Sequence, residues 1–144
     1  MSVVVIMPAY NAAKTLKLTY ENIPQHCVDK IILTDDVSQD ETVDISQELG
    51  LKTIVHVQNR GYGGNQKTSY LEALKEGAEI VVMLHPDNQY DATRIPALIE
   101  PIRQGKSGLY QSPQFTRTLP EVTSRYHWAE IEQDTSVSTE TQNV

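Results

Sequence analysis

The chain has 144 residues, with 12 lysine and arginine residues against 19 aspartate and glutamate residues, and a formal net charge of −7 at pH 7. This length fits one domain, and the acidic balance argues against a nucleic-acid partner, because nucleic-acid-binding surfaces are usually basic. The longest apolar run, Val3 to Met7, is too short for a transmembrane segment. Cys27 is the only cysteine, which excludes an internal disulfide and favours a cytoplasmic setting.

The amino-terminal part predicts a strand, a helix and a second strand. The run from Val3 to Met7 is β-branched and has no polar alternation, which is typical of a strand buried on both faces. Apolar residues then recur at helical spacing from Ala12 up to Pro24. Residues 30–34 supply the second strand.

A capping box predicts the second helix. Ser38 and Glu41 match the pattern in which a hydroxyl and a carboxylate three residues later satisfy the first free N–H groups of a helix. This helix should run to about Leu49, with Gly50 ending it. Residues 53–57 predict a third strand.

The remaining elements alternate in the same way. Gly63 and Gly64 open a third helix, whose predicted apolar face holds Tyr70, Leu71, Leu74 and Ala78. Residues 80–84 predict a fourth buried strand. A helix that starts near Thr93 and runs to about residue 104 keeps Pro96 in its first turn, where proline is tolerated.

The alternating order predicts an α/β fold, with a parallel sheet covered by helices on both faces. Ligands of such sheets bind beyond the carboxyl ends of the strands. No element is predicted beyond Gly105. Residues 130–144 are polar, with four acidic residues and no basic one, and predict a disordered tail.

Polar residues follow all four predicted strands, at Pro8 to Asn11, Asp35 and Asp36, Asn59 to Lys67, and His85 to Asp91. Each has a simple structural interpretation. Asp35 and Asp36 suit a helix entry, Tyr10 a surface aromatic, and Asp87 a turn beside Pro86. Their joint placement at one edge favours a binding site.

Residues 59–67 form a glycine-rich turn that leads into a helix. Glycine lets the backbone come close to a ligand, and the N–H groups at a helix start favour phosphate. Arg60 and Lys67 add positive charge. The pattern is neither the dinucleotide fingerprint nor the Walker loop, and a flexible loop before a helix is the alternative.

Asp87 is a candidate magnesium ligand, because one carboxylate with substrate phosphates and water makes a common coordination shell. His85 suits a softer ion such as manganese or zinc, or is a hydrogen-bonded packing residue. His26, His56 and His127 lie in no motif. No serine or cysteine has the context of a nucleophile elbow, which argues against a hydrolase of that kind.

Four motifs, at residues 4–11, 35–42, 59–67 and 83–91, together resemble the inverting family 2 glycosyltransferases. Within that family the sequence is most similar to the branch of dolichyl-phosphate and polyprenyl-phosphate sugar transferases. The resemblance implies a Rossmann-like GT-A fold, a three-layer sandwich with a mostly parallel sheet. It also implies transfer of a sugar from a nucleoside diphosphate sugar to an acceptor, with inversion, and assigns residues 1–105 to the donor-binding half.

The resemblance also implies roles for single residues. Pro8 and Tyr10 resemble the lining of the nucleotide pocket, and Asp36 resembles the carboxylate that accepts hydrogen bonds from the base. Gly64 and Lys67 fall at the family's glycine-rich turn near the nucleotide.

The metal motif departs from the family pattern in part. Asp87 resembles the last acid of the family's Asp-x-Asp motif, which holds magnesium or manganese on the diphosphate. His85 stands in the place of the first acid, and Val37 stands where the family usually has glycine.

The family's acceptor half, with its catalytic base, would follow residue 105, but residues 106–129 do not match it. The catalytic base is unknown from the sequence, and Glu121 and His127 are possible bases only in the sense that they can accept protons. We therefore expect a truncated transferase that binds its donor but transfers sugar slowly by itself. The acceptor is expected to be a lipid phosphate, reached at the inner face of the membrane. A non-catalytic nucleotide-sugar binding module and a nucleotidyltransferase are the alternatives.

Overall fold

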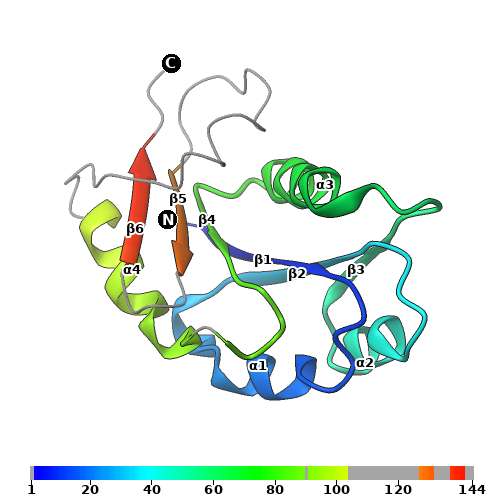
Figure 1. Ribbon diagram of the computed structural model, residues 1–144. Coiled ribbons are helices and arrows are strands. Elements are labelled where there is room, and N and C mark those ends of the chain that lie inside the picture. The colour runs from blue at the N-terminus through cyan, green and yellow to red at the C-terminus, as the bar shows by residue number, and fades with distance from the viewer. Residues whose placement is uncertain (1, 90, 104–126, 132–136, 142–144) are drawn as a thin grey trace.

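A computed structural model of the chain describes residues 2–89, 91–103, 127–131 and 137–141 (Figure 1). Its strands form a six-stranded sheet in the order β3-β2-β1-β4-β5-β6. The strands are β1 (Val3–Ala9), β2 (Lys30–Asp35), β3 (Lys52–Val55), β4 (Ile80–Met83), β5 (His127–Ile131) and β6 (Val137–Thr141). Neighbouring strands run parallel except β5 and β6, which are antiparallel. The predicted mostly parallel α/β sheet is therefore confirmed.

Helices cover both faces of this sheet (Figure 1). They are α1 (Leu16–Asn22), α2 (Thr42–Glu48), α3 (Gly61–Lys75) and α4 (Ile95–Arg103), with short 3₁₀ turns η1 (Gln25–Cys27) and η2 (Ala92–Arg94). α3 lies on one face, and α1, α2 and α4 lie on the other. Across the described residues, no helix combines the length and the apolar character that a bilayer crossing requires.

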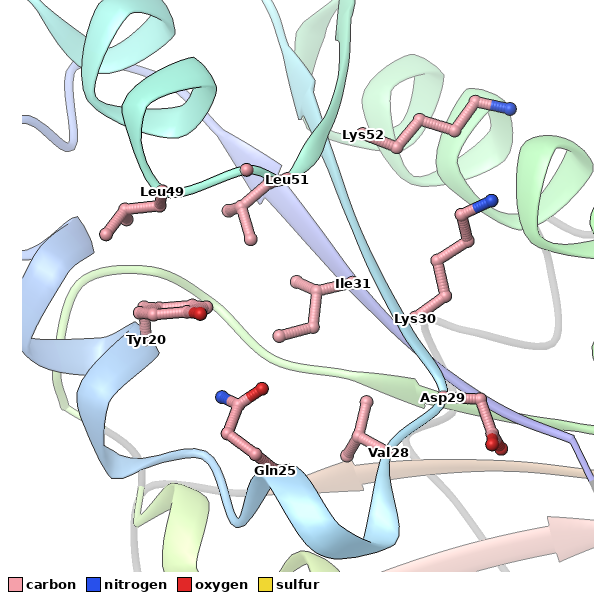
Figure 2. Close-up of a pocket in the computed structure, with 10 residues that line it drawn as sticks. Tyr20, Gln25, Val28, Asp29, Lys30, Ile31, Leu49, Leu51 and Lys52 are labelled. Atoms are coloured by element: carbon pink, nitrogen blue, oxygen red, sulfur yellow. The ribbon is translucent and has the colours of Figure 1, made fainter.

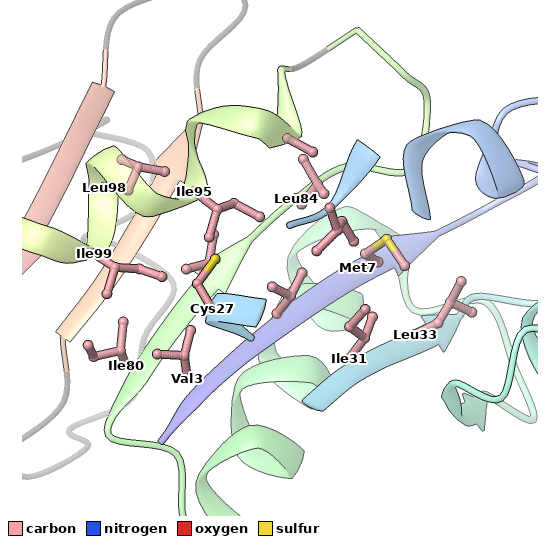
Figure 3. Close-up of a cluster of buried hydrophobic side chains, with 14 of the residues drawn as sticks. Val3, Met7, Cys27, Ile31, Leu33, Ile80, Leu84, Ile95, Leu98 and Ile99 are labelled. Carbon is pink, nitrogen blue, oxygen red and sulfur yellow. The ribbon is translucent and has the colours of Figure 1, made fainter. Parts of the chain in front are cut away.

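The apolar run of β1 is divided between two hydrophobic cores because successive side chains of a strand point to opposite faces. Val3, Val5 and Met7 belong to the larger core, which α1 and α4 cover (Figure 3). Val4 and Ile6 belong to the core under α3. Each of these side chains is essentially inaccessible to solvent, and burying one contributes roughly 1.5–3 kcal/mol. The continuous apolar run is thus explained by a strand between two helical layers.

Most element boundaries follow the prediction within a few residues. β3 ends at Val55, and Val57, which the prediction included, is 93% exposed. α1 begins at Leu16 and is shorter than predicted. α4 begins at Ile95, so Pro96 lies in its first turn as expected.

The capping box predicted at Ser38 and Glu41 is wrong. α2 begins at Thr42, and Glu41 makes no side-chain capping hydrogen bond there. The Ser38 hydroxyl instead donates to Asp35 Oδ1 and accepts the backbone N–H of Asn11 at 2.8 Å. The Ser38 hydroxyl therefore bonds to the Asp35 carboxylate at the end of β2 and does not cap α2.

The face of α3 that meets the sheet is more polar than predicted. Leu71, which the prediction placed on that face, is 42% exposed. Ser69 is buried instead, and its hydroxyl donates to Thr34 Oγ1 at 2.9 Å. Asn65 is also buried and donates to the carbonyl of Ala9 at 3.2 Å. These hydrogen bonds offset the cost of burying polar side chains between α3 and the sheet. A search for apolar spacing does not predict such an interface.

The carboxyl-terminal part differs from the prediction, which placed no element beyond Gly105 and a disordered tail at residues 130–144. β5 pairs with β4, with Ala129 opposite Val82, and β6 then pairs with β5. Such pairing is stabilised by the neighbouring strand, which a local pattern does not report. The segment 104–126, including Glu121, lies outside the described residues.

Candidate functional site

A cleft of about 200 Å³ opens at the carboxyl end of the sheet, lined by Pro8, Tyr10, Asn11, Ala12, Thr15, His85, Pro86 and Asp87. β1 and β4 are adjacent and parallel, so the loops that leave them meet at one edge. The structure therefore brings together three of the residues predicted from sequence, Pro8, Tyr10 and Asp87. Tyr10 is 54% exposed and presents an aromatic surface at the cleft.

Hydrogen bonds between loops hold the walls of this cleft. The Thr15 hydroxyl donates to the carbonyl of Pro86 at 2.6 Å and joins the loop after β1 to the loop after β4. Asn11 has a positive φ of 50°, and its side-chain oxygen accepts the N–H of Gln39 at 2.8 Å. This second bond joins the loop after β1 to the loop after β2.

Asp87 lies on an exposed turn at the exit of β4. Its Oδ1 accepts the N–H of Gln89 at 3.1 Å, and the intervening Asn88 has a positive φ of 58°. Within the described ranges, no group of three or more His, Cys, Asp and Glu residues is arranged to hold a metal ion. An exposed single carboxylate beside a cleft fits a divalent cation whose other ligands are phosphate and water.

His85 is held by an aromatic partner from α3. The ring of Tyr62 stacks on it with centroids 5.4 Å apart and an interplanar angle of 21°. The Tyr62 hydroxyl lies 2.9 Å from His85 Nε2. The first turn of α3 therefore contacts the cleft through this pair, which the sequence interpretation missed because the two residues lie on separate motifs.

Asp36 lies at the amino terminus of α3, although it belongs to the loop after β2. Its Oδ1 accepts the backbone N–H of Arg60 at 2.7 Å, and its Oδ2 accepts that of Gly61 at 2.9 Å. Its carbonyl accepts the side-chain amide of Asn59 at 3.1 Å. The expectation that these helix-start N–H groups bind phosphate is therefore wrong for Arg60 and Gly61, because a carboxylate of the chain itself occupies them.

The pKa of the Asp36 carboxyl group is lowered although the side chain is buried. Burial by itself raises its pKa, but hydrogen bonds from the Arg60 N–H, the His56 ring and the Gly61 N–H outweigh burial and hold the pKa below its ordinary value. Asp36 is therefore ionised at neutral pH, and its charge is compensated by oriented donors.

His56, which lies in no sequence motif, is the partner that completes this cluster. It is 7% exposed, and its Nδ1 lies 2.8 Å from Asp36 Oδ1. Its Nε2 lies 2.8 Å from the Thr68 hydroxyl. The only sequence signal for it is its position near the end of the third predicted strand, at the same edge as the other polar residues.

Gly64 and Lys67 lie within α3 rather than in a turn before it, and neither lines the cleft. A Cβ on Gly64 would come within 2.7 Å of the Arg60 Cβ, so the glycine permits a close contact inside the chain. Lys67 is exposed. The predicted nucleotide residues thus divide into Pro8 and Tyr10 in the cleft and a second set beside α3.

His127 lies at the amino ends of the parallel strands, whereas Asp87 follows the carboxyl end of β4. The His127 backbone pairs with Ile80 at the amino end of β4 in a parallel register. This backbone position is at the end of the sheet away from the cleft, and it argues against His127 as the base of a reaction there.

The mostly parallel sheet, its two helical layers and the cleft at the carboxyl ends of β1 and β4 define an α/β domain of the kind whose ligands bind beyond the strand ends. The sequence model described as "Glycosyl transferase family 2" matches residues 4–142, and the chain belongs to this family. The resemblance derived from four motifs is confirmed, and the match extends well past residue 105.

Two curated relatives are named as sugar transferases of dolichyl phosphate or dolichol phosphate. A UDP-N-acetylglucosamine–dolichyl-phosphate N-acetylglucosaminyltransferase of Methanococcus voltae is 34% identical over 114 residues, covering 67% of this chain and 45% of that protein. A dolichol-phosphate mannosyltransferase of Pyrococcus furiosus is 32% identical over 109 residues, covering 73% of this chain and 31% of that protein. The chain spans less than half the length of these relatives.

Solved structures share the fold at lower identity. Glucosyl-3-phosphoglycerate synthase of Mycobacterium tuberculosis, in complex with Mn²⁺, uridine diphosphate and glucosyl-3-phosphoglycerate, has a TM-score of 0.60 and 19% identity, covering 81% of this chain and 46% of that chain. TarS 1–349 of S. aureus has a TM-score of 0.60 and 24% identity, covering 85% and 42%. These glycosyltransferase neighbours support the GT-A form of the three-layer fold.

Proposed function

We propose that this chain binds a nucleoside diphosphate sugar in the cleft and contributes the donor side of an inverting sugar transfer. The observation that carries the proposal is the meeting of Tyr10 and Asp87 in one cleft, from the ends of two adjacent strands. An aromatic surface suits a nucleobase or a ribose, and an exposed carboxylate suits a cation on a diphosphate. The cleft therefore offers both an aromatic surface for the nucleoside and a carboxylate for a cation on the diphosphate.

The nucleotide and metal residues predicted from the sequence have separate tasks in this proposal. Tyr10 and Pro8 form the wall that packs on the nucleoside, and Asp36 accepts a hydrogen bond from the base beside them. Gly64 and Lys67 belong to the helix that borders the nucleotide. Asp87 is the residue that would hold Mg²⁺ or Mn²⁺, whose positive charge stabilises the departing nucleoside diphosphate.

The loop contacts keep these groups aligned during the transfer. The bond between Thr15 and Pro86 fixes the separation of the two loops, so Asp87 stays opposite the wall that binds the nucleoside. Tyr62 fixes the ring of His85 two residues before Asp87. Such preorganisation lowers the cost of positioning charged groups at the moment of reaction.

The acceptor proposed for the transfer is a lipid phosphate of the polyprenyl type. The names of the relatives from Methanococcus voltae and Pyrococcus furiosus support this choice. A lipid acceptor would require the chain to work at a membrane surface. The family match favours a sugar transferase over the nucleotidyltransferase alternative.

Titration calorimetry with uridine and guanosine diphosphate tests the donor site. Binding should be tighter with Mg²⁺ or Mn²⁺ than without metal, and Asp87→Asn should remove that difference, because the carboxylate and the diphosphate share one cation. Asp44→Asn, which changes an exposed acid on α2, should behave as the wild type. Equal affinity with metal, without metal and in Asp87→Asn would sink the proposal.

A further inference from the structure

His56 is a buried histidine that the proposed reaction does not yet use. Its backbone N–H donates to the carbonyl of Asp35 at 2.9 Å, which holds it at the end of β3 beside β2. Its ring lies between Asp36, on the loop after β2, and Thr68, on α3. One side chain therefore joins the loop after β2 to α3.

The partners of the ring determine where its protons lie. Ionised Asp36 can only accept, so Nδ1 donates to it. On the other side of the ring, Nε2 lies 2.8 Å from the Thr68 hydroxyl, which also lies 3.1 Å from the carbonyl of Gly64. The ring is therefore held on both sides, and its Nδ1 donates to an ionised carboxylate. A charge-assisted bond of this kind is stronger than a bond between neutral groups.

This bond limits how the Asp36 carboxylate can turn. Its Oδ1 is shared between His56 and the backbone N–H of Arg60, and its Oδ2 is bonded to the N–H of Gly61. The three donors come from the end of β3 and from the start of α3. Without the His56 donor, only the backbone N–H groups of Arg60 and Gly61 would bind the carboxylate. These two groups belong to the turn whose position the carboxylate itself fixes.

We propose that His56 is a positioning residue of the nucleotide pocket, which fixes the Asp36 carboxylate and the turn at residues 59–61 for binding of the nucleoside. The proposal rests on the proposed function, in which Asp36 accepts a hydrogen bond from the base. Thr68 is the residue that holds the His56 ring in place. Neither residue is predicted to touch the substrate.

Four variants test this role. His56→Leu keeps much of the side-chain volume and removes both ring nitrogens, whereas His56→Asn keeps an N–H close to the Nδ1 position. Thr68→Val keeps the shape of the side chain and removes the hydroxyl. His26→Asn, which changes an exposed histidine on η1, is the matched control.

Two readouts separate positioning from packing, namely carbon-13 NMR titration of the Asp36 carboxyl group and calorimetry of uridine diphosphate in the presence of Mg²⁺. His56→Leu should raise the pKa of Asp36 towards its ordinary value and weaken nucleotide binding about ten-fold. His56→Asn should restore most of both properties. Thr68→Val should show an intermediate effect, and His26→Asn should match the wild type.

The outcomes separate this proposal from the proposed function. A His56→Leu protein with a lower Tm but wild-type Asp36 titration and wild-type affinity would overturn positioning and leave the donor site intact. If that variant does not fold, Thr68→Val decides by the same two readouts. If the wild type does not bind the nucleotide, the proposed function is refuted, and so is the role of His56 in positioning a nucleotide site. A raised Asp36 pKa in His56→Leu would then show only that His56 stabilises the Asp36 carboxylate in the fold.

Discussion

Asp36 accepts the backbone N–H of Gly61, the first residue of α3, at 2.9 Å. The carboxylate therefore takes the place that an external anion takes at many helix starts. It binds the loop after β2 to the start of α3 and balances the positive end of the helix. Stability and site geometry both depend on this one side chain.

Replacing the charge of Asp36 should destabilise the fold. Hydrogen bonds to a charged group contribute about 1.5–3 kcal/mol, and Asp36→Asn weakens several of them at once, so we expect a loss of about 2 kcal/mol in the free energy of unfolding. Urea unfolding measures this loss. Glu79→Gln, at an exposed turn before β4, should change the stability by less than about 0.5 kcal/mol.

The loss should also depend on pH, with a sign that follows from the lowered pKa of folded Asp36. A carboxyl group with a lower pKa in the folded state stabilises the fold fully above its unfolded pKa, about 4, and loses this contribution as the pH falls through the folded value. The stability difference between wild type and Asp36→Asn should be largest near neutral pH and shrink below about pH 4. A difference that stays constant from pH 7 to pH 3 would contradict the assignment.

Val37 should be replaceable by glycine with a gain in stability. Its φ of 66° places a β-branched residue in the left-handed region, at a cost of about 1–2 kcal/mol. Glycine removes this strain but adds freedom to the unfolded chain, which offsets up to about 1 kcal/mol. We expect Val37→Gly to raise Tm by a few degrees, with Val37→Asn showing a similar gain. A lower Tm in both variants would show that the Val37 side chain stabilises the loop more than its backbone strains it.

The sequence predicted the layers of the fold well because its strands are long apolar runs. Val3 to Met7 is buried on both faces, as the absence of polar alternation indicated. Such a run needs no knowledge of its partners to be recognised. The polar face of α3 was invisible for the opposite reason, because the burial of Ser69 depends on Thr34, a residue far away in the chain.

The candidate site was predicted in part for the same reason. Tyr10 and Asp87 follow apolar strands, so their shared edge could be inferred from chain order. His56 and Tyr62 gain their roles only from partners across the fold, namely Asp36 and His85. The spacing of these residues along the chain does not predict either pair.

Gly64→Ala should destabilise the start of α3. The added methyl group would lie 2.7 Å from the Arg60 Cβ, which is too close for either backbone to stay in place. Overpacking of this kind costs about 1–3 kcal/mol. In an Arg60→Gly background the opposing atom is absent, so the same substitution should cost much less. A double-mutant cycle by urea unfolding would refute the contact if both backgrounds gave equal losses.

Thr15→Val should weaken donor binding more than it weakens the fold. The substitution keeps the side-chain shape and removes the hydroxyl that donates to the Pro86 carbonyl at 2.6 Å. A neutral hydrogen bond contributes about 1 kcal/mol, so Tm should fall only slightly. The loop that carries Asp87 would then move independently of the wall formed by Tyr10, and affinity for uridine diphosphate with Mg²⁺ should fall about five-fold or more, because binding must first restore the alignment. Thr15→Ser retains the hydroxyl and should bind as the wild type. Calorimetry of the three proteins decides the matter, and an unchanged affinity in Thr15→Val would mean that the two loops are aligned by other contacts.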